Sequence, residues 1–462
     1  MAIVKPIQTE QAPPARGPAA KYQHILEEYR PHAGALLEEI MQRERGLGCT
    51  FGADPVPTAL RPHFLTKGQA AHVQQVTTVI LNCIEKVVRF YFDHPEARDF
   101  IVLNEAERSL IDIEPNMSRT VIKSRLDGFF KGNTDLQFTE MNCDSPAGMA
   151  YCDVQEAIFR DTEPMREMRN SYKFPALNRT ARLLTALVAA YRDAGNGSTA
   201  PNIAITDWRE VKTNPEFVLI ANEFNRRGFK TLVVDPRDFD FQRGRLFAPD
   251  GTRIDLVYRR VITREIAEKE MECQALITAA RKKKVCLANP FRSKVVANKS
   301  TLAVLSDPAF KSLFTTRERE VIRKSVPWTR NFAPCAVRWQ GRKWDIQDLA
   351  RKQRRVLVLK PADGYGGQDV HIGRDTKAKD WEAVMHRALG GNWVLQGLVE
   401  PPVEFYPVAG PRGLAYRRYN VNLNPFAFGG RFGGCISRLS ITPIINVTAG
   451  GAMVPTMTVD PK

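Results

Sequence analysis

Short apolar strands alternate with amphipathic helices between residues 198 and 288, and this alternation limits the possible fold more than any other feature of the chain. Strand–helix–strand order is typical of a parallel sheet. We therefore predict an α/β protein with a Rossmann-like parallel domain at 196–290. No glycine fingerprint follows its first strand, so this domain need not bind a nucleotide itself. The predicted elements are strands 202–206, 230–235 and 254–258, helices 215–227 and 264–282, and a ribbon turning at 249–251.

The segments on either side are predicted to form the other parts of a mixed α/β protein. Helical spacing runs through 21–45 and 69–93, and a third helix at 176–193 ends at a Gly- and Asn-rich breaker. Buried strands are expected at 355–361 and 393–396. The predicted units are a disordered tail at 1–20, an N-terminal part at 21–195, the parallel domain, and a C-terminal part at 291–462.

Residues 120–142 form a predicted β-hairpin, because two strands flank the turn-forming cluster at 131–134. A two-residue loop at 133–134 would set Asp127 opposite Glu140 and Arg125 opposite Asn142, all on one face. Two carboxylates roughly 5 Å apart repel each other unless a cation lies between them, and such an oxygen cluster suits Mg²⁺. The same spacing also fits a surface hairpin with ordinary charges.

A glycine-rich loop follows the predicted strand at 355–361. Gly364, Gly366 and Gly367 would let backbone N–H groups approach phosphate oxygens closely, and Lys360 would add a point charge. No Gly-Lys-Ser/Thr sequence follows, so the loop is not a P-loop, and the next element is predicted to be a strand, which excludes a Rossmann fingerprint. A plain hairpin loop is the alternative interpretation.

The amino-acid composition limits the classes of function that the chain can have. The net charge of +16 suits nucleic acid, acidic lipid or small anions, but the basic residues are dispersed and no RNA-binding aromatic signature accompanies them. We therefore expect no nucleic-acid partner. No apolar stretch reaches the roughly 18 residues of a membrane span. The eight cysteines form no Cys-x-x-Cys pair, which is typical of reduced thiols in a cytoplasmic protein.

Several short motifs, taken in order, resemble one known family. They are Arg125-x-Asp127, Glu140-x-Asn142 followed by 143–148, Asn298-Lys299, the Lys360 glycine loop and the strand at 394–396. This order resembles the circularly permuted ATP-grasp enzymes related to glutathionylspermidine synthase (its synthetase domain) and, more distantly, eukaryotic-type glutathione synthetase. The resemblance covers about residues 100–455. It implies an ATP- and Mg²⁺-dependent carboxylate–amine ligase that forms an amide through an acylphosphate.

Carried over position by position, the resemblance implies a role for each matching residue. Metal ligands would be Asp127, Glu140 and Asn142, and Arg125 would face the transferring phosphoryl group. ATP would be held by Lys299, Lys360, Gly364, Gly366 and Gly367, with the adenine read by the backbone of Gln396, Gly397 and Leu398. Ser145 would lie near the substrate. Arg438 would be a second anion-binding arginine, with a structural salt bridge as its alternative.

The chain departs from the family in one place that bears on function. Glutathione synthetases carry an acidic metal ligand inside the glycine loop, about where this chain has Gly366, and neither Asp363 nor Asp369 is in register to replace it. A catalytically degenerate protein that binds nucleotide as a partner or scaffold is therefore the second hypothesis. The substrates, a small-molecule or peptide carboxylate and an amine, cannot be named from the sequence, and neither can the oligomeric state.

Overall fold

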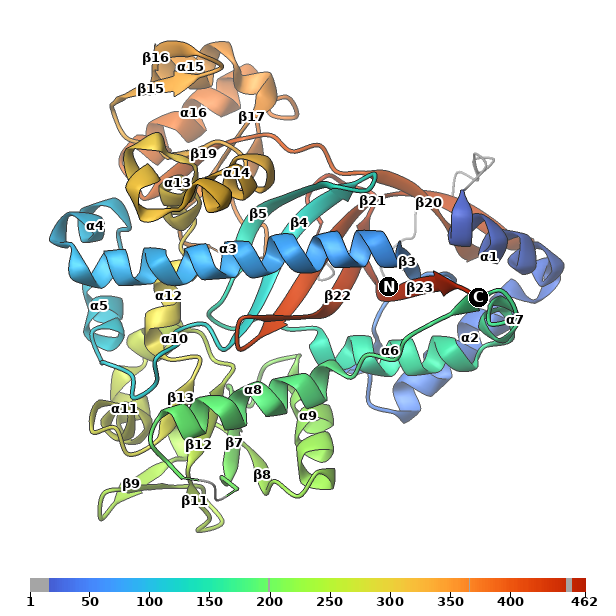
Figure 1. Ribbon diagram of the computed structural model, residues 1–462, viewed down its shortest axis with the longest axis horizontal. Coiled ribbons are helices and arrows are strands. Elements are labelled where there is room, and N and C mark those ends of the chain that lie inside the picture. The colour runs from blue at the N-terminus through green and yellow to red at the C-terminus, as the bar shows by residue number, and fades with distance from the viewer. Residues whose placement is uncertain (1–15, 198–199, 365, 446–450) are drawn as a thin grey trace.

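The computed structural model describes residues 16–197, 200–364, 366–445 and 451–462. Its centre is a large, mostly antiparallel sheet with a long helix, α3, across one face (Figure 1). The sheet order is β3 (His63–Thr66), β23 (Ala452–Pro461), β22 (Arg431–Ser440), β21 (Gly413–Phe428), β4 (Lys123–Lys131) and β5 (Asp135–Asn142), with β20 (Val403–Gly410) beside β21 and β6 (Tyr172–Lys173) beside β23.

Helix α3 (Lys67–Asp93) confirms the predicted helix at 69–93. It begins at a capping box, in which the Thr66 hydroxyl accepts from the Gln69 N–H while the Gln69 side chain reaches back to the Thr66 N–H. Its apolar stripe packs on Leu126 and Phe138 of the sheet. The opposite face is covered by α6 (Met149–Asp161) and α8 (Arg179–Asp193), which pack on Ile436 and Met453 among others.

The three strands predicted between 202 and 258 are confirmed, and they belong to a four-stranded parallel sheet that lies below the central sheet in Figure 1. Its order is β13 (Cys286–Ala288), β12 (Leu256–Arg259), β7 (Ile203–Thr206) and β8 (Thr231–Val234). The single helix predicted at 264–282 is wrong: α10 (Thr263–Glu268) and α11 (Gln274–Arg281) are separated by a 3-10 turn. Other elements here are α9 (Asn214–Arg226) and the ribbon β9 (Asp240–Gln242), β10 (Arg245–Phe247) and β11 (Arg253–Ile254).

A smaller α/β region lies above α3 in Figure 1. Its antiparallel sheet has the order β14 (Thr329–Asn331), β19 (Trp393–Gly397), β17 (Leu357–Pro361) and β18 (His371–Ile372), which confirms the strands predicted at 355–361 and 393–396. The sheet packs on Trp381 and Met385 of α16. The region also contains α13 (Ser300–Ser306), α14 (Thr316–Ser325), β15 (Ala336–Trp339), β16 (Arg342–Asp345), α15 (Ile346–Lys352) and α16 (Ala378–Leu389). Helix α12 (Lys294–Ala297), which precedes α13 in the chain, lies below α3 in Figure 1.

The N-terminal segment corrects two predictions. The helix predicted at 21–45 is two helices, α1 (Gly17–Glu28) and α2 (Ala33–Gly46), because Pro31 lies in a 3-10 turn between them. The predicted tail at 1–20 overlaps helix α1, which begins at Gly17, and residues 1–15 lie outside the described residues. The remaining elements are β1 (Thr50–Phe51), β2 (Asp54–Pro55), α4 (Pro95–Phe100), α5 (Glu105–Ile111) and α7 (Glu163–Met168).

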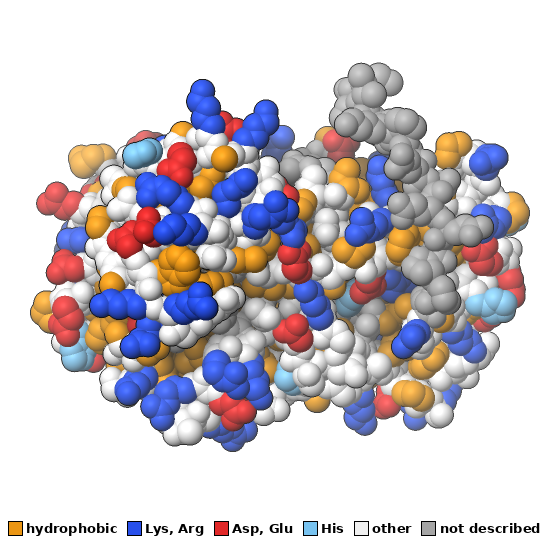
Figure 2. All heavy atoms as spheres, turned by 90° about the horizontal axis from the view of Figure 1, so that it is seen from above, with side chains coloured by type: hydrophobic (Ala, Val, Ile, Leu, Met, Phe, Trp, Pro, Cys, Tyr) orange, Lys and Arg blue, Asp and Glu red, His pale blue; other side chains and the backbone are white. Residues whose placement is uncertain are grey.

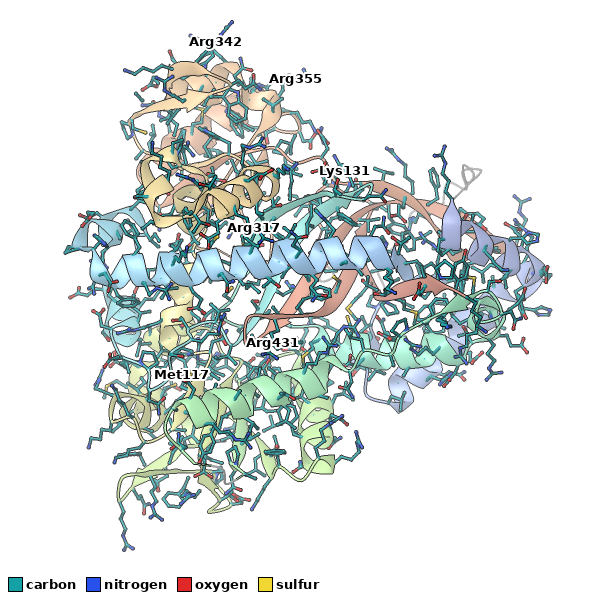
Figure 3. All side chains as sticks on the ribbon, viewed as in Figure 1. Met117, Lys131, Arg317, Arg342, Arg355 and Arg431 are labelled. Atoms are coloured by element: carbon teal, nitrogen blue, oxygen red, sulfur yellow. The ribbon has the colours of Figure 1, made fainter. Side chains whose placement is uncertain are left out.

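Surface charge is mixed. On the face seen from above, Lys and Arg side chains are numerous, but Asp and Glu side chains lie among them (Figure 2). Arg342 and Arg355 of the smaller region project outward from it (Figure 3). Among the described residues, no helix combines the length and apolarity that a membrane span requires.

The β4–β5 hairpin has the predicted pairing at the site but not the predicted loop. Asp127 lies opposite Glu140 and Arg125 opposite Asn142, as expected. The loop, however, has three residues, since Lys131 pairs with Asp135, and Lys131 marks this tip in Figure 3. The register changes between Asp127 and Gly128, where Thr139 is an extra residue on β5. This β-bulge restores the pairing that the longer loop would have shifted by one residue.

Gly128 allows the close approach of the two strands beside this bulge. A Cβ atom at this position would lie 2.5 Å from the Gln137 carbonyl oxygen, which is backbone and cannot turn away. We expect Gly128→Ala to lower the free energy of unfolding by roughly 1–3 kcal/mol, measured by urea denaturation. Gly68→Ala in α3, where a Cβ meets nothing within 4 Å, is the control and should not destabilise the protein. Equal stability of the two variants would contradict this account of the bulge.

Candidate functional site

One cavity of about 450 Å³ lies where the central sheet, the smaller sheet and the loop before α6 meet. All fourteen residues predicted from the sequence line its wall, although the roles assigned to them remain predictions. They are Arg125, Asp127, Glu140, Asn142, Ser145, Lys299, Lys360, Gly364, Gly366, Gly367, Gln396, Gly397, Leu398 and Arg438. Segments more than three hundred residues apart in sequence thus share one site.

Asp127 is held by two arginines. The Arg125 guanidinium donates to both carboxylate oxygens, at 2.7 and 3.0 Å, and Arg438 Nη2 donates to Oδ2 at 2.6 Å. Burial alone would raise the pKa of Asp127, but Arg125 and Arg438 outweigh it and hold the pKa below its usual value. Arg438 therefore forms the salt bridge that the sequence left as its alternative, within the cavity wall.

Removing the Asp127 charge would leave two buried guanidiniums without their partner. We expect Asp127→Asn to lower the free energy of unfolding at pH 7 by roughly 3–5 kcal/mol, as for a broken buried ion pair. Because the folded-state pKa is lowered, this stabilisation is present above the unfolded pKa and is lost as the pH falls through the folded pKa. Urea denaturation at pH 7 and pH 3 checks both statements. A wild-type-like stability at pH 7 would contradict them.

Glu140 and Asn142 present oxygen donors beside this arginine pair. The Glu140 carboxylate forms an ion pair with Lys299 Nζ at 3.3 Å, and 23% of the Glu140 side chain is exposed. A carboxylate and an amide oxygen are hard donors of the kind that Mg²⁺ takes, together with water and phosphate oxygens. Both oxygens of Asp127 are already bonded to arginine, so the residues that fit a Mg²⁺ ion best are Glu140 and Asn142. Among the described residues, no cluster of three or more His, Cys, Asp or Glu side chains offers another metal site.

The glycine loop is attached to the cavity wall at its first residues. Lys299 donates its backbone N–H to the Ala362 carbonyl at 2.7 Å and its Nζ to the Gly364 carbonyl at 2.5 Å. Asp363 forms ion pairs with Lys294, at 2.7 Å, and with Arg264. Both oxygens of the Asp363 carboxylate are thus engaged by cations.

Asp369, the other acid of the glycine loop, is also engaged. It pairs with Arg387 at 2.6 Å and with His371 at 2.7 Å. Both acids of the glycine loop are therefore bonded to cationic or imidazole groups of the protein. Tyr365 within this loop, and the late loop at 446–450 that the resemblance also covers, lie outside the described residues.

Lys360 projects from β17 into the buried centre of the site. Its Nζ donates to the Thr139 carbonyl at 2.8 Å and to Gln396 Oε1 at 2.9 Å. The Thr139 carbonyl is the one displaced by the bulge, so the hairpin also positions this lysine. Burial and the nearby Lys299 charge lower the pKa of Lys360 to about 7. The side chain is therefore close to half protonated near neutral pH.

The segment predicted to read adenine has its N–H groups engaged. Gly397 donates to the Trp328 carbonyl at 2.8 Å, and Leu398 donates to the Val356 carbonyl at 2.9 Å. These two N–H groups are thus bonded inside the protein. Ser145, predicted to lie near the substrate, lines the cavity, but its hydroxyl donates to the Arg260 carbonyl.

Several lining residues were missed by sequence reasoning. Asn422 of β21 accepts from the Arg438 backbone and guanidinium at 3.2 and 3.3 Å, and the alternating asparagines at 420, 422 and 424 were a signal for it. Phe51 and Val56 line the cavity from the β1–β2 hairpin. They carry no motif and lie about seventy residues before Arg125, so no pattern in the sequence indicated them.

Cys143, inside the motif segment, has no sign of a chemical role. Its side chain is buried among apolar residues, and burial raises the pKa of its thiol well above the usual value. Its carbonyl accepts from the Asn289 side chain. The residue packs beneath the site.

Neither a protein-family model nor a curated protein matches the sequence. Among solved structures, the apo form of a glutathione synthetase-like effector, GSS30, from Globodera pallida aligns over 97% of this chain and 100% of its own, with a TM-score of 0.62 and 12% identity. A putative gamma-glutamylcysteine synthetase from Methylobacillus flagellatus aligns over 87% of this chain and 89% of its own, with a TM-score of 0.42 and 10% identity, too low to carry an argument. The first likeness shows that this α/β chain shares the fold of a glutathione synthetase-like protein.

Proposed function

We propose that the protein is an ATP- and Mg²⁺-dependent carboxylate–amine ligase that forms an amide through an acylphosphate, with a circularly permuted ATP-grasp fold. The observation that carries this proposal is the convergence of Glu140, Asn142, Arg125, Lys299 and Lys360 on one cavity. Phosphoryl transfer asks little covalent work of a protein, so charge neutralisation and positioning suffice. This cavity supplies both.

In the proposed reaction, a substrate carboxylate oxygen attacks the γ-phosphorus of ATP, the bond to ADP breaks, and an amine then displaces phosphate from the acylphosphate. Lys299 and Lys360 would bind phosphate oxygens, and Arg125 would face the transferring group. Glu140 and Asn142 would hold Mg²⁺, which when bound neutralises phosphate charge. The buried cavity would limit the entry of water, which would otherwise hydrolyse an acylphosphate.

The test is mass spectrometry of the products after the protein is incubated with ATP, Mg²⁺ and a metabolite extract. We expect a new mass equal to an acid plus an amine less one water, together with ADP. The engaged loop acids Asp363 and Asp369 favour the second candidate, a degenerate protein that binds nucleotide as a partner or scaffold. ATP binding without substrate-dependent ADP release would support that second candidate and overturn the first.

A further inference from the structure

The cavity has two apolar ends with the charged residues between them. One end lies on the smaller sheet, where Val358 pairs with Gln396 and with Ile372, and Leu398 follows. Lys360, which the proposed function assigns to the ATP phosphates, lies on the same strand as Val358. The proposed function would place adenine at this end of the cavity. It assigns no ligand to the other end.

The second end is walled by side chains from four separate elements. They are Phe51 and Val56 beside the β1–β2 hairpin, Tyr151 of α6, Ile436 of β22 and Met453 of β23. Val56, Tyr151, Ile436 and Met453 belong to one packed cluster. The Tyr151 hydroxyl donates to the Thr50 carbonyl at 2.7 Å, so its polar atom is already satisfied. Thr213 adds one hydroxyl to this end of the cavity. It follows Lys212, whose backbone carbonyl accepts a hydrogen bond from the Gly52 N–H.

This apolar end is continuous with the arginine pair. Ile436 and Arg438 are two residues apart on β22 and so share a face, and Met453 is the strand partner of Arg438. Arg125 Nη1 donates to the Ala147 carbonyl at 2.9 Å, and the next residue, Gly148, lies against Ile436 and Met453. A carbon chain that extends from a carboxylate at the arginine pair can therefore reach Ile436 and Met453.

The charges of the cavity argue against a polycationic substrate. Its described lining holds four acids, and each is already paired with a cation: Asp127 with Arg125 and Arg438, Glu140 with Lys299, Asp144 with Arg259, and Asp363 with Lys294 and Arg264. A polyamine would need unpaired acids to replace its hydration. The lining therefore favours an anion that carries an apolar group.

Resting on the proposed function, we propose that the acid substrate is a carboxylic acid with an apolar side chain, bound by Phe51, Val56, Tyr151, Ile436 and Met453. The carboxylate lies at Arg125 and Arg438, and the side chain fills the second apolar end. A polar side chain of equal size would lose its hydration there without gaining hydrogen bonds.

The test compares two acids of equal size and charge, 4-methylpentanoate and succinamate. Binding of each is measured by calorimetry with a non-hydrolysable ATP analogue and Mg²⁺. Turnover is measured as ADP and hydroxamate, with hydroxylamine as the amine: its nitrogen attacks the acylphosphate carbon, phosphate leaves and a proton is lost. We expect 4-methylpentanoate to bind at least roughly tenfold more tightly than succinamate.

Two variants test whether the preference for 4-methylpentanoate arises at this end of the cavity. Val56→Thr, an isosteric change at a residue that is 3% exposed, should weaken 4-methylpentanoate binding roughly tenfold. The same change at Val218, which is 47% exposed on α9, should leave binding unchanged. Ile436→Ala should shift preference toward the larger 3-phenylpropanoate, a change in selectivity that a loss of folding would not produce.

The outcomes separate this inference from the proposed function. Preferential binding of 4-methylpentanoate supports the inference, and the absence of ADP would then overturn only the ligase proposal. Equal or tighter binding of succinamate overturns the inference, and hydroxamate formed from it would leave the ligase proposal standing. If neither acid binds, or if Val218→Thr weakens binding as much as Val56→Thr does, the inference is also overturned.

Discussion

Substrate-dependent ADP release is expected to fall at least about 10²- to 10³-fold in Glu140→Ala, to the detection limit of a coupled assay. Glu140 is the acid of the cavity that arginine does not hold, and its carboxylate is the donor that fits Mg²⁺ best. The fold should persist, because Glu140 is partly exposed and its single ion pair, to Lys299, is 3.3 Å long. Thermal denaturation checks this second expectation.

The matched control is Glu320→Ala. Glu320 is a glutamate of α14 with 61% of its side chain exposed, and it forms an ion pair with Lys324 of the same helix. Its replacement should change neither ADP release nor stability. Full activity of Glu140→Ala would rule out the metal role assigned to this residue.

Lys360→Met is expected to raise the ATP concentration needed for half-maximal activity about 100-fold. Methionine fills a similar volume without burying a charge, and this offsets the loss of the hydrogen bonds to the Thr139 carbonyl and to Gln396, so the fold should persist. Since the pKa of Lys360 is about 7 in the free protein, bound phosphates would raise it. ATP binding should therefore take up close to one proton at pH 8 and almost none at pH 6, where the lysine is already protonated.

Calorimetry in buffers of different ionisation enthalpy measures this proton uptake directly. The uptake at pH 8 should disappear in Lys360→Met. Lys377→Met, at an exposed lysine that precedes α16, is the control and should retain both the uptake and the ATP requirement. An unchanged ATP requirement in Lys360→Met would contradict the proposed phosphate contact.

Where side-chain periodicity was long and uninterrupted, the sequence predicted the structure well. Helix α3 and three of the four parallel strands follow directly from the spacing of their apolar residues, whereas the short strand β13 was not predicted. The breaks between consecutive helices were harder to predict from the sequence. Pro31 divides the first helix, but the turn between α10 and α11 has no proline or glycine, and its last residue, Cys273, is buried in the core.

The candidate site shows the same contrast. Alternation along a strand was sufficient to place Asp127 opposite Glu140, because facing side chains depend only on local register. The arginine pair around Asp127 was not predictable in detail, since Arg438 comes from a strand about three hundred residues later. Phe51 and Val56 reach the cavity only through tertiary packing, which leaves no periodic signal.

The bulge at Thr139 separates the site from the hairpin tip. Pairing on the site side of the bulge is set by the extra residue and by the Lys360 bond to the Thr139 carbonyl, whereas the loop is tied to α3 through Gln69. The tip at 132–134 is therefore a position where a tag or a fluorescent label can be inserted. A reporter placed there would follow hairpin movement while the Glu140 and Asn142 side chains keep their facing partners.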